Sequence, residues 1–239
     1  MKTLIVSDYD GTLKTNKLET LKKSVEILKM LSSDQNKIMI STGRLYKSIT
    51  QEISENYIPF NYISCANGNL LFDENFEIIF KTHVDSKIIK QLKPFYAQIL
   101  EIESLDEFGS LTSNYPTEYL IHIIDDLNVR RQIVNMLFSS KNFDYCTDGD
   151  NKFSIHIFNL SNKLKTIEIV KKILHLRNDE IFAIGDGYND LEMLKKYNGY
   201  IVGHNDEILT EIDGIRSFET FEKCAEDIQH TLTLKRGRK

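Results

Sequence analysis

The chain has 239 residues, of which 41% are hydrophobic and 27% charged, as in an ordinary globular protein that is long enough to bury a sizeable core. Its net charge of −5 argues against a general nucleic-acid-binding protein, and no apolar run approaches the roughly 18 residues of a membrane span. Three widely spaced cysteines favour reduced thiols over a disulfide framework or a zinc site. No signal peptide opens the sequence, so we expect a cytoplasmic protein that binds neither nucleic acid nor membrane.

Strands and helices alternate along the first third of the chain. Short apolar runs predict buried strands, and apolar residues at helical spacing predict amphipathic helices between them. An Asn-Gly pair then leads into a predicted hairpin. In order, the predicted elements are a strand at 3–7, a helix at 18–32, a strand at 37–41, a helix at 44–55, a strand at 61–65 and a hairpin with its turn at Asp73–Asn75.

The last third repeats this alternation. The predicted elements are a helix at 164–176, a strand at 181–185, a helix at 190–197, a strand at 199–203 and a helix at 218–232. Strands that alternate with helices predict an α/β fold, with a doubly wound parallel sheet covered by helices on both faces.

The middle of the chain has a different pattern. We predict a helix at 86–99, a polar loop at 103–118, a strand at 118–124, a helix at 126–138 and strands near 143–146 and 153–158. This order is typical of a small α+β unit. The sequence therefore predicts a core domain formed by 1–81 and 160–239, with a smaller α+β domain inserted at 82–159.

Four short polar segments fall at the ends of predicted strands or the start of a helix. They are Asp8-Tyr9-Asp10-Gly11-Thr12, Ser41-Thr42-Gly43-Arg44, Lys163, and Gly185-Asp186-Gly187-Tyr188-Asn189-Asp190. In open α/β sheets, ligands bind outside the carboxyl ends of the strands. We therefore expect these segments to form one site.

The chemistry of that site follows from its carboxylates. Asp8 and Asp10 would face the same way on a continuing strand, where at roughly 6 Å their repulsion is about 3 kcal/mol. Several carboxylates without histidine or thiolate select a hard cation such as Mg²⁺, which offsets this repulsion and leaves coordination positions for phosphate oxygens. The hydroxyls, the lysine and the backbone amides would receive the remaining phosphate oxygens. Asp8 can then act as a nucleophile on phosphorus, and Asp10 as an acid and then a base.

Other interpretations of these segments remain open at this stage. An EF-hand loop would need glycine where Leu13 stands, and a dinucleotide-binding loop would need glycine where Asp190 stands. Arg44 could simply lie on the surface after a helix cap. His122 and His156, each between two isoleucines in a predicted strand, could line a pocket or be ordinary half-buried histidines.

Taken together, DYDGTL, STGR, the lysine at a helix start and GDGYND resemble, in order, the four signature motifs of the haloacid dehalogenase-like (HAD) hydrolase superfamily. The insertion after the second motif, preceded by CANG, is similar to the type IIB cap of the Cof-type phosphatases. The resemblance covers essentially the whole chain. It implies a Rossmann-like core whose cap closes over the substrate, which excludes water from the site.

The resemblance also implies a role for each matching residue. Asp8 would be the nucleophile and Asp10 the general acid/base. The phosphate-binding residues would be Thr42, Gly43, Lys163 and Asn189, and the Mg²⁺ site would involve Asp8, Asp10 through its main-chain carbonyl, Asp186 and Asp190. Arg44, His122 and His156 are candidate substrate contacts. Leu164 follows Lys163 where glycine is common, so Lys165 is an alternative for the third-motif lysine.

The function predicted in this way is a Mg²⁺-dependent phosphatase that hydrolyses small phosphorylated metabolites, sugar phosphates first, through an aspartyl-phosphate intermediate. A phosphomutase on the same core is the alternative enzyme. A phospho-aspartate signalling module of receiver type is a third hypothesis, but such modules are roughly half this length and have no inserted cap.

Overall fold

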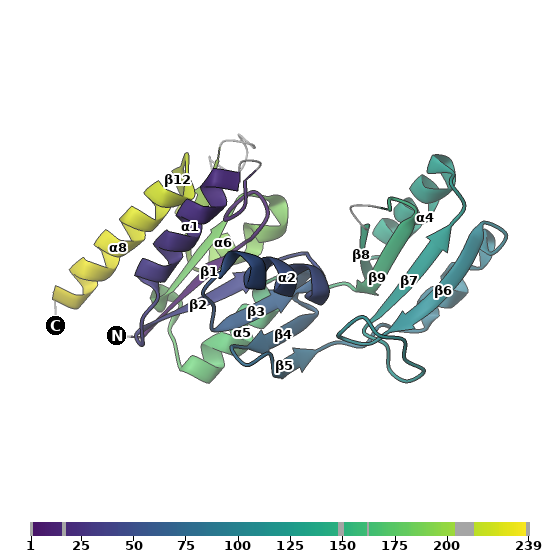
Figure 1. The fold of residues 1–239 in the computed structure, drawn as a ribbon, viewed down its shortest axis with the longest axis horizontal. Helices are drawn as coiled ribbons and strands as arrows, with labels where there is room; N and C mark the ends of the chain where they lie inside the picture. Colours follow the sequence, from purple (N-terminus) through teal and green to yellow (C-terminus); the bar gives the residue numbers. More distant parts are fainter. Residues whose placement is uncertain (1, 16–17, 148–150, 162, 204–212, 238–239) are drawn as a thin grey trace.

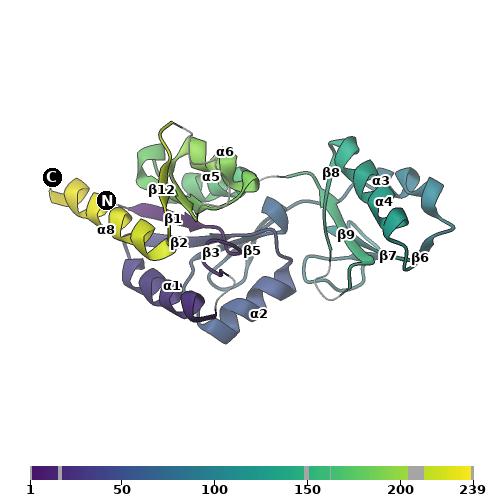
Figure 2. The same ribbon diagram turned by 90° about the horizontal axis from the view of Figure 1, so that it is seen from above.

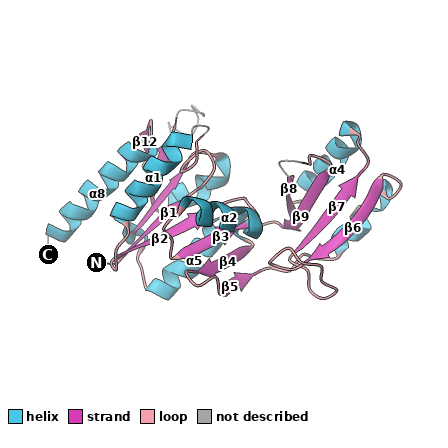
Figure 3. Cartoon of the chain, viewed as in Figure 1, coloured by secondary structure: helices cyan, strands magenta, loops and turns pink. Residues whose placement is uncertain are grey.

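The computed structural model describes residues 2–15, 18–147, 151–161, 163–203 and 213–237. In these ranges the chain forms an eight-stranded and a four-stranded sheet, which lie at opposite ends of the molecule (Figures 1 and 3). None of the described helices combines the length and the apolar character that are needed to cross a membrane.

The eight-stranded sheet has its first strand near the centre. In spatial order it contains β12 (Arg216–Phe218), β11 (Asn198–Val202), β10 (Ile181–Gly185), β1 (Thr3–Ser7), β2 (Asn36–Ser41), β3 (Tyr62–Cys65), β4 (Leu70–Asp73) and β5 (Ile78–Lys81). The strands from β12 to β3 are parallel, and β4 and β5 add an antiparallel hairpin at one edge. The carboxyl ends of β1, β2, β3 and β10 therefore lie along the same edge of the sheet.

Helices cover both faces of this sheet (Figure 2). One face packs against α1 (Leu18–Leu31), α2 (Tyr46–Asn56) and α8 (Phe221–Gly237), and the other against α5 (Lys163–Leu174) and α6 (Leu191–Lys196). Strand side chains alternate between faces, so Ile5 of β1 joins the first apolar cluster while Leu4 and Val6 join the second. The predicted doubly wound α/β fold is confirmed.

The four-stranded sheet is antiparallel and forms the cap, the name used here for this sheet and its two helices. Its spatial order is β6 (Ile99–Leu105), β7 (Glu118–Ile123), β9 (Ser154–Asn159) and β8 (Phe143–Thr147). The helices α3 (Lys87–Gln91) and α4 (Leu127–Ser140) pack on one face through Ile88, Ile133 and Leu137. The predicted second α+β unit is present, and its sheet lies within the predicted insertion at 82–159.

The predicted helix at 86–99 and the polar loop from 103 were wrong in their extent. The helix ends at Gln91 because Pro94, which has no backbone N–H to continue it, lies in a short 3₁₀ turn. The chain then forms the edge strand β6, which extends to Leu105. The pairing of β6 with β7 supplies the order that the local sequence did not indicate.

Two further differences lie near the C-terminus, whereas the predicted hairpin is confirmed. The short strand β12 was not predicted, and the last helix begins at Phe221 and not at 218. The hairpin of β4 and β5 is present as predicted, because the Asp73 carboxylate accepts hydrogen bonds from the N–H groups of Asn75 and Glu77, both at 2.9 Å.

Candidate active site

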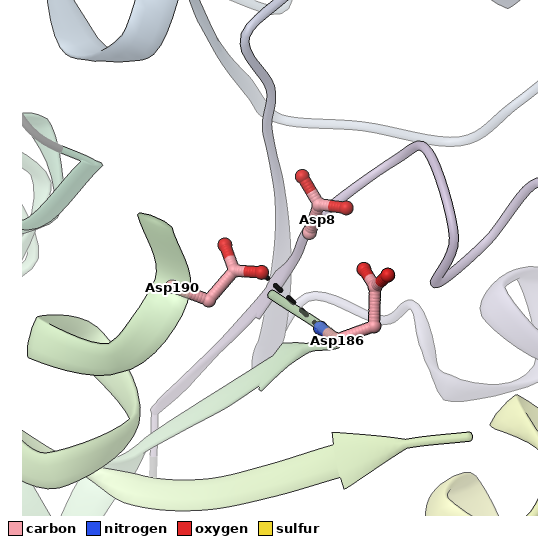
Figure 4. A group of neighbouring side chains, drawn as sticks. All are labelled: Asp8, Asp186 and Asp190. Atoms are coloured by element: carbon pink, nitrogen blue, oxygen red, sulfur yellow. Dashed lines mark hydrogen bonds between the residues drawn. The ribbon is translucent and has the colours of Figure 1, made fainter. Parts of the chain in front are cut away.

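Three aspartates from different elements meet at the carboxyl edge of the large sheet (Figure 4). Asp8 follows β1, Asp186 follows β10, and Asp190 lies at the start of α6. Each offers a carboxylate oxygen, and these oxygens lie within 4.8 Å of one another. Because β1 and β10 are hydrogen-bonded neighbours, the N–H of Asp8 donates to the carbonyl of Ile184 at 2.9 Å, which fixes the two strand ends together.

Two glycines of the motifs provide the space for these carboxylates. A Cβ atom on Gly11, which has φ of +85°, would lie 2.0 Å from Asp186 Oδ2. A Cβ atom on Gly185 would lie 2.5 Å from Asp190 Cγ. A side chain at either position would displace the carboxylate that it meets, so glycine at these positions lets Asp186 and Asp190 take their places in the cluster.

Lys163 lies against Asp8 and Asp190. Its ammonium donates hydrogen bonds to Asp8 Oδ1 and, at 2.6 Å, to Asp190 Oδ1, and its side chain is only 1% exposed. Asp190 Oδ2 accepts from the N–H groups of Asp186 and Gly187, both at 3.1 Å. Asp190 therefore uses both carboxylate oxygens to hold Lys163 and the loop.

The alternative lysine is placed elsewhere. Lys165 is exposed, and its ammonium lies 4.7 Å from the centre of the Phe80 ring. The structure thus brings Lys163, and not Lys165, to Asp8.

The remaining oxygens of the cluster fit a hard divalent cation. Asp186 is oriented by the Thr12 hydroxyl, which donates to its Oδ1 at 2.8 Å. Three carboxylates face one ammonium, so the cluster carries an excess of negative charge that a cation would balance. Since Asp190 is engaged within the protein, Asp8 and Asp186 are the better placed ligands.

Burial, and to a smaller extent the neighbouring charges, perturbs the pKa values of the cluster. Burial raises the pKa of Asp8 from 3.8 to about 8, with Asp190 and Asp186 adding to the rise and Lys163 opposing it. Burial likewise raises the pKa of Asp186. Although burial alone would lower it, the two neighbouring carboxylates raise the pKa of Lys163, so this lysine stays protonated.

A cavity of about 730 Å³, called here the catalytic cavity, opens above the cluster between the core and the cap. Among the predicted site residues, its lining includes Asp8, Asp10, Thr42, Gly43, Arg44, His156, Asp186 and Asn189. Thr42 is buried, and its hydroxyl oxygen accepts from the Arg44 N–H at 3.1 Å, which leaves the hydroxyl proton to donate. A ligand in this cavity would contact residues of the first, second and fourth motifs, whereas Lys163 of the third motif and Asp190 are buried behind Asp8.

Asp10 lies apart from the three clustered aspartates. Arg44 holds its carboxylate in a two-pronged pair, with Nε to Oδ2 and Nη2 to Oδ1 both at 2.7 Å. The Asp10 side chain is 52% exposed, whereas that of Asp8 is 7% exposed. The structure thus separates a buried carboxylate from an accessible one, and a ligand role for the main-chain carbonyl of Asp10 stays a prediction.

Sequence reasoning missed the residues that hold Arg44. Glu52 of α2 accepts from Arg44 Nη1 at 2.9 Å, from the Tyr9 hydroxyl at 2.7 Å and from Lys14. Although burial alone would raise it, the bonds from Lys14 and Tyr9 lower the pKa of Glu52. The Arg44 guanidinium also lies over the Tyr9 ring, 4.9 Å from its centre. Helical spacing gave Glu52 no distinguishing signal, because charged residues on an exposed helix face are common.

Asn67 was also missed, although a signal for it existed. It follows β3 at the same sheet edge as the other motifs, has a left-handed φ of 51° and lines the catalytic cavity. Its Nδ2 donates to Asp144 Oδ2 of the cap at 2.9 Å. The strand-end argument that selected the other segments applies to this Asn-Gly pair as well.

The two cap histidines differ in position. His156 lines the catalytic cavity, and its Nδ1 lies 3.0 Å from Glu118 Oε1. His122 is not among the residues that line this cavity, and its Nδ1 lies 2.9 Å from the Ser154 hydroxyl. Substrate contact by either histidine stays a prediction.

Comparison with known proteins identifies the family. The sequence profile of the haloacid dehalogenase-like hydrolases matches residues 5–103 and 101–213. The chain belongs to this family. The resemblance found in the four motifs is confirmed, and the cluster of aspartates lies in the region that this profile covers.

Relatives with assigned names are phosphatases. A 5-amino-6-(5-phospho-D-ribitylamino)uracil phosphatase of Bacillus subtilis is 21% identical, over 95% of this chain and 94% of its own length. A HAD-like hydrolase of Bacteroides thetaiotaomicron has the same fold, with a TM-score of 0.71, 19% identity and coverage of 97% of this chain and 100% of its own. A sucrose-phosphatase of Synechocystis, solved with sucrose and phosphate, has a TM-score of 0.63, 17% identity and coverage of 96% and 98%.

We expect Mg²⁺ to stabilise the metal-free protein more at pH 8 than at pH 6. With a pKa of about 8 against 3.8 unfolded, folded Asp8 keeps a proton that the unfolded chain loses. The unfolded state then binds fewer protons, so stability falls as pH rises from about 4 to 8, and Mg²⁺ competes with this proton. Thermal unfolding with and without Mg²⁺ measures the effect. Asp34→Asn, which removes an exposed charge outside the cluster, should leave it unchanged, and an equal shift at both pH values would contradict the assignment.

We expect Lys163→Met to lower kcat for phosphate-ester hydrolysis by about 100-fold or more, because it removes the positively charged ammonium beside Asp8. Lys165→Met is the matched control from the same helix and should leave kcat unchanged. Steady-state kinetics with circular dichroism as a check of folding distinguishes the two, and Lys163→Arg keeps a charge if the methionine variant unfolds. Loss of activity in the Lys165 variant alone would reverse the assignment.

Proposed function

We propose that the protein is a phosphoric monoester hydrolase that uses Mg²⁺ to remove phosphate from small phosphorylated metabolites, with sugar phosphates as the first candidates. The observation that carries this proposal is the buried Asp8 carboxylate, held by Lys163 at the base of a cavity that Thr42 and Asp186 also line. A nucleophile, a phosphate-binding group and cation ligands therefore face one enclosed volume.

In the first step, an Asp8 carboxylate oxygen attacks the phosphorus atom and the bond to the alcohol oxygen breaks, which gives an aspartyl phosphate. The Thr42 hydroxyl donates to one phosphoryl oxygen, and the Lys163 ammonium neutralises charge beside the Asp8 oxygen. Asp8 and Asp186 would hold Mg²⁺, which would supply positive charge to offset that of the carboxylates and of the phosphoryl group.

Asp10 serves the proton transfers. In the first step it gives a proton to the departing alcohol oxygen, and in the second it takes a proton from the water that attacks the aspartyl phosphate. Its exposed position on the cavity wall suits contact with the leaving group, whereas the buried Asp8 suits contact with phosphorus. Arg44 donates a hydrogen bond to each oxygen of the Asp10 carboxylate. At least one of these two hydrogen bonds must therefore break before Asp10 can carry a proton.

The size of the catalytic cavity and its position between core and cap favour a small molecule over a protein chain. The named relatives point the same way, since one is a phosphatase of a phosphorylated ribityl compound and another was solved with sucrose and phosphate. A phosphomutase would use the same core but return the phosphoryl group to the substrate. Release of inorganic phosphate without a bisphosphate activator separates the two reactions.

We expect Asp8→Asn to abolish phosphate release. We expect Asp10→Asn to lower the rate more when the leaving group needs protonation more. With p-nitrophenyl phosphate the departing phenolate needs little protonation, so Asp10→Asn should retain more of its rate than with an alkyl phosphate such as glycerol phosphate. Phosphate release and intact-protein mass spectrometry are the measurements. The Asp10→Asn variant should carry one added phosphoryl group, because it hydrolyses the aspartyl phosphate slowly. The double variant Asp8→Asn/Asp10→Asn should carry none. Normal turnover by Asp8→Asn, or by the wild-type protein in EDTA, would contradict the mechanism.

A further inference from the structure

A second cavity of about 290 Å³, called here the distal cavity, adjoins the catalytic cavity. The two share Leu45 and Lys47 of the core and His156 of the cap among their lining residues. The shared residues make the two volumes neighbours along one cleft. A ligand that fills both cavities would pass these shared residues, His156 among them.

The cap sheet connects the two cavities through one row of cross-strand neighbours. Cys146 of β8 pairs with His156 of β9, His156 pairs with Leu120 of β7, and Leu120 pairs with Glu103 of β6. Cys146 and His156 line the catalytic cavity, while His156, Leu120 and Glu103 line the distal one. Directly opposed residues on adjacent strands point to the same face of the sheet, so this row forms one wall of the cleft.

The distal cavity combines apolar walls with an excess of carboxylates. Leucines and Phe108 supply the apolar surface, and the charged lining residues are Glu103, Glu107, Glu118 and Lys47.

Glu107 is already paired with Lys81 at 2.8 Å, and Glu118 lies 3.0 Å from the His156 ring nitrogen. Lys47 donates to the carbonyl of Gly109 at 3.2 Å. Glu103 lies 3.7 Å from the His122 ring, which is beyond hydrogen-bonding distance.

This distribution decides which chemical groups the distal cavity accepts. A carboxylate offers only acceptor oxygens, so Glu103 favours hydroxyl or amino donors. A second phosphate or a carboxylate on the substrate would instead lie beside Glu103 in a partly enclosed volume, where like charges repel more strongly than in water. The leucine side chains would cover the carbon atoms of the same ligand.

Building on the proposed function, we propose that the distal cavity binds the end of the substrate remote from its phosphate, and that Glu103 selects an uncharged, hydroxyl-bearing end over an anionic one. The substrates so defined are monophosphates of polyols or glycosides. Bisphosphates and phosphorylated sugar acids are disfavoured by charge, even where their length and shape would fit.

Two ligands that differ only at the remote carbon test this proposal. D-glucitol 6-phosphate ends in a hydroxymethyl group, and 6-phospho-D-gluconate carries a carboxylate at the same position. We expect the wild-type protein to prefer glucitol 6-phosphate by about tenfold or more in kcat/KM. Glu103→Gln, which keeps the shape and removes the charge, should lose most of this preference by raising kcat/KM for the phosphogluconate.

The matched control is Glu101→Gln. Glu101 is an exposed carboxylate on the same strand, outside both cavities, so its neutralisation should leave the preference at the wild-type value. A second variant, Leu120→Phe, enlarges a side chain in the cleft wall. It should lower kcat/KM for glucitol 6-phosphate about tenfold more than for p-nitrophenyl phosphate, whose single ring does not reach as far.

The outcomes separate the two proposals. Equal kcat/KM for the two hexose-derived ligands in wild type, or an unchanged preference in Glu103→Gln, overturns the role of the distal cavity while p-nitrophenyl phosphate hydrolysis still supports a phosphatase. If no phosphate ester is hydrolysed, the proposed function fails instead. Calorimetric binding of both ligands to Asp8→Asn then decides the cavity's role, with tighter binding of glucitol 6-phosphate supporting it and equal binding rejecting it.

Discussion

The Lys163 ammonium, buried between the carboxylates of Asp8 and Asp190, is the interaction on which the rest of the site depends. Lys163 and Asp8, which are 155 positions apart in the sequence, are directly hydrogen-bonded here. A buried charge without a partner costs several kcal/mol, so these three groups are stable in the interior only together. Asp186 adds a further carboxylate, and the group of three could hold a cation. The packing of the core and the assembly of the site therefore depend on the same contacts.

The parallel sheet positions the carboxylates of the site. Adjacent positions of β1 and β10 bring Asp8 and Asp186 to one edge, and Gly11 and Gly185 leave room for carboxylates there. The same edge gives Asp8 and Asp10 different environments although they are two residues apart. Burial suits Asp8 to attack phosphorus, and exposure suits Asp10 to exchange protons with the leaving group and water.

Local sequence predicted the core, and strand-end position together with residue type selected residues that the structure brings to one cavity. Asp8, Thr42 and Asp186 were found in this way, and all three line the catalytic cavity. The cap was harder to predict. The extent of β6 depends on its pairing with β7, and Glu103 acquires its position in the cleft only through the cross-strand row.

The partners of Arg44 were out of reach for a related reason. Arg44 lies in the segment between β2 and α2. Asp10 reaches it from the loop after β1, and Glu52 reaches it from α2, and the sequence pattern indicates neither contact. Sequence reasoning placed Arg44 among substrate contacts, and the structure adds that it holds the carboxylate of Asp10, the proposed general acid. Residues defined by a backbone rule were therefore predictable, and those defined by side-chain packing were not.

A crystal structure with Mg²⁺ and trifluoroberyllate, a mimic of the phosphoryl group, tests the central claim most directly. We predict beryllium joined to an Asp8 carboxylate oxygen, with the cation between Asp8 and Asp186 and Lys163 still in contact with Asp8. A beryllium adduct on another residue, or a cation bound away from Asp8 and Asp186, would contradict it.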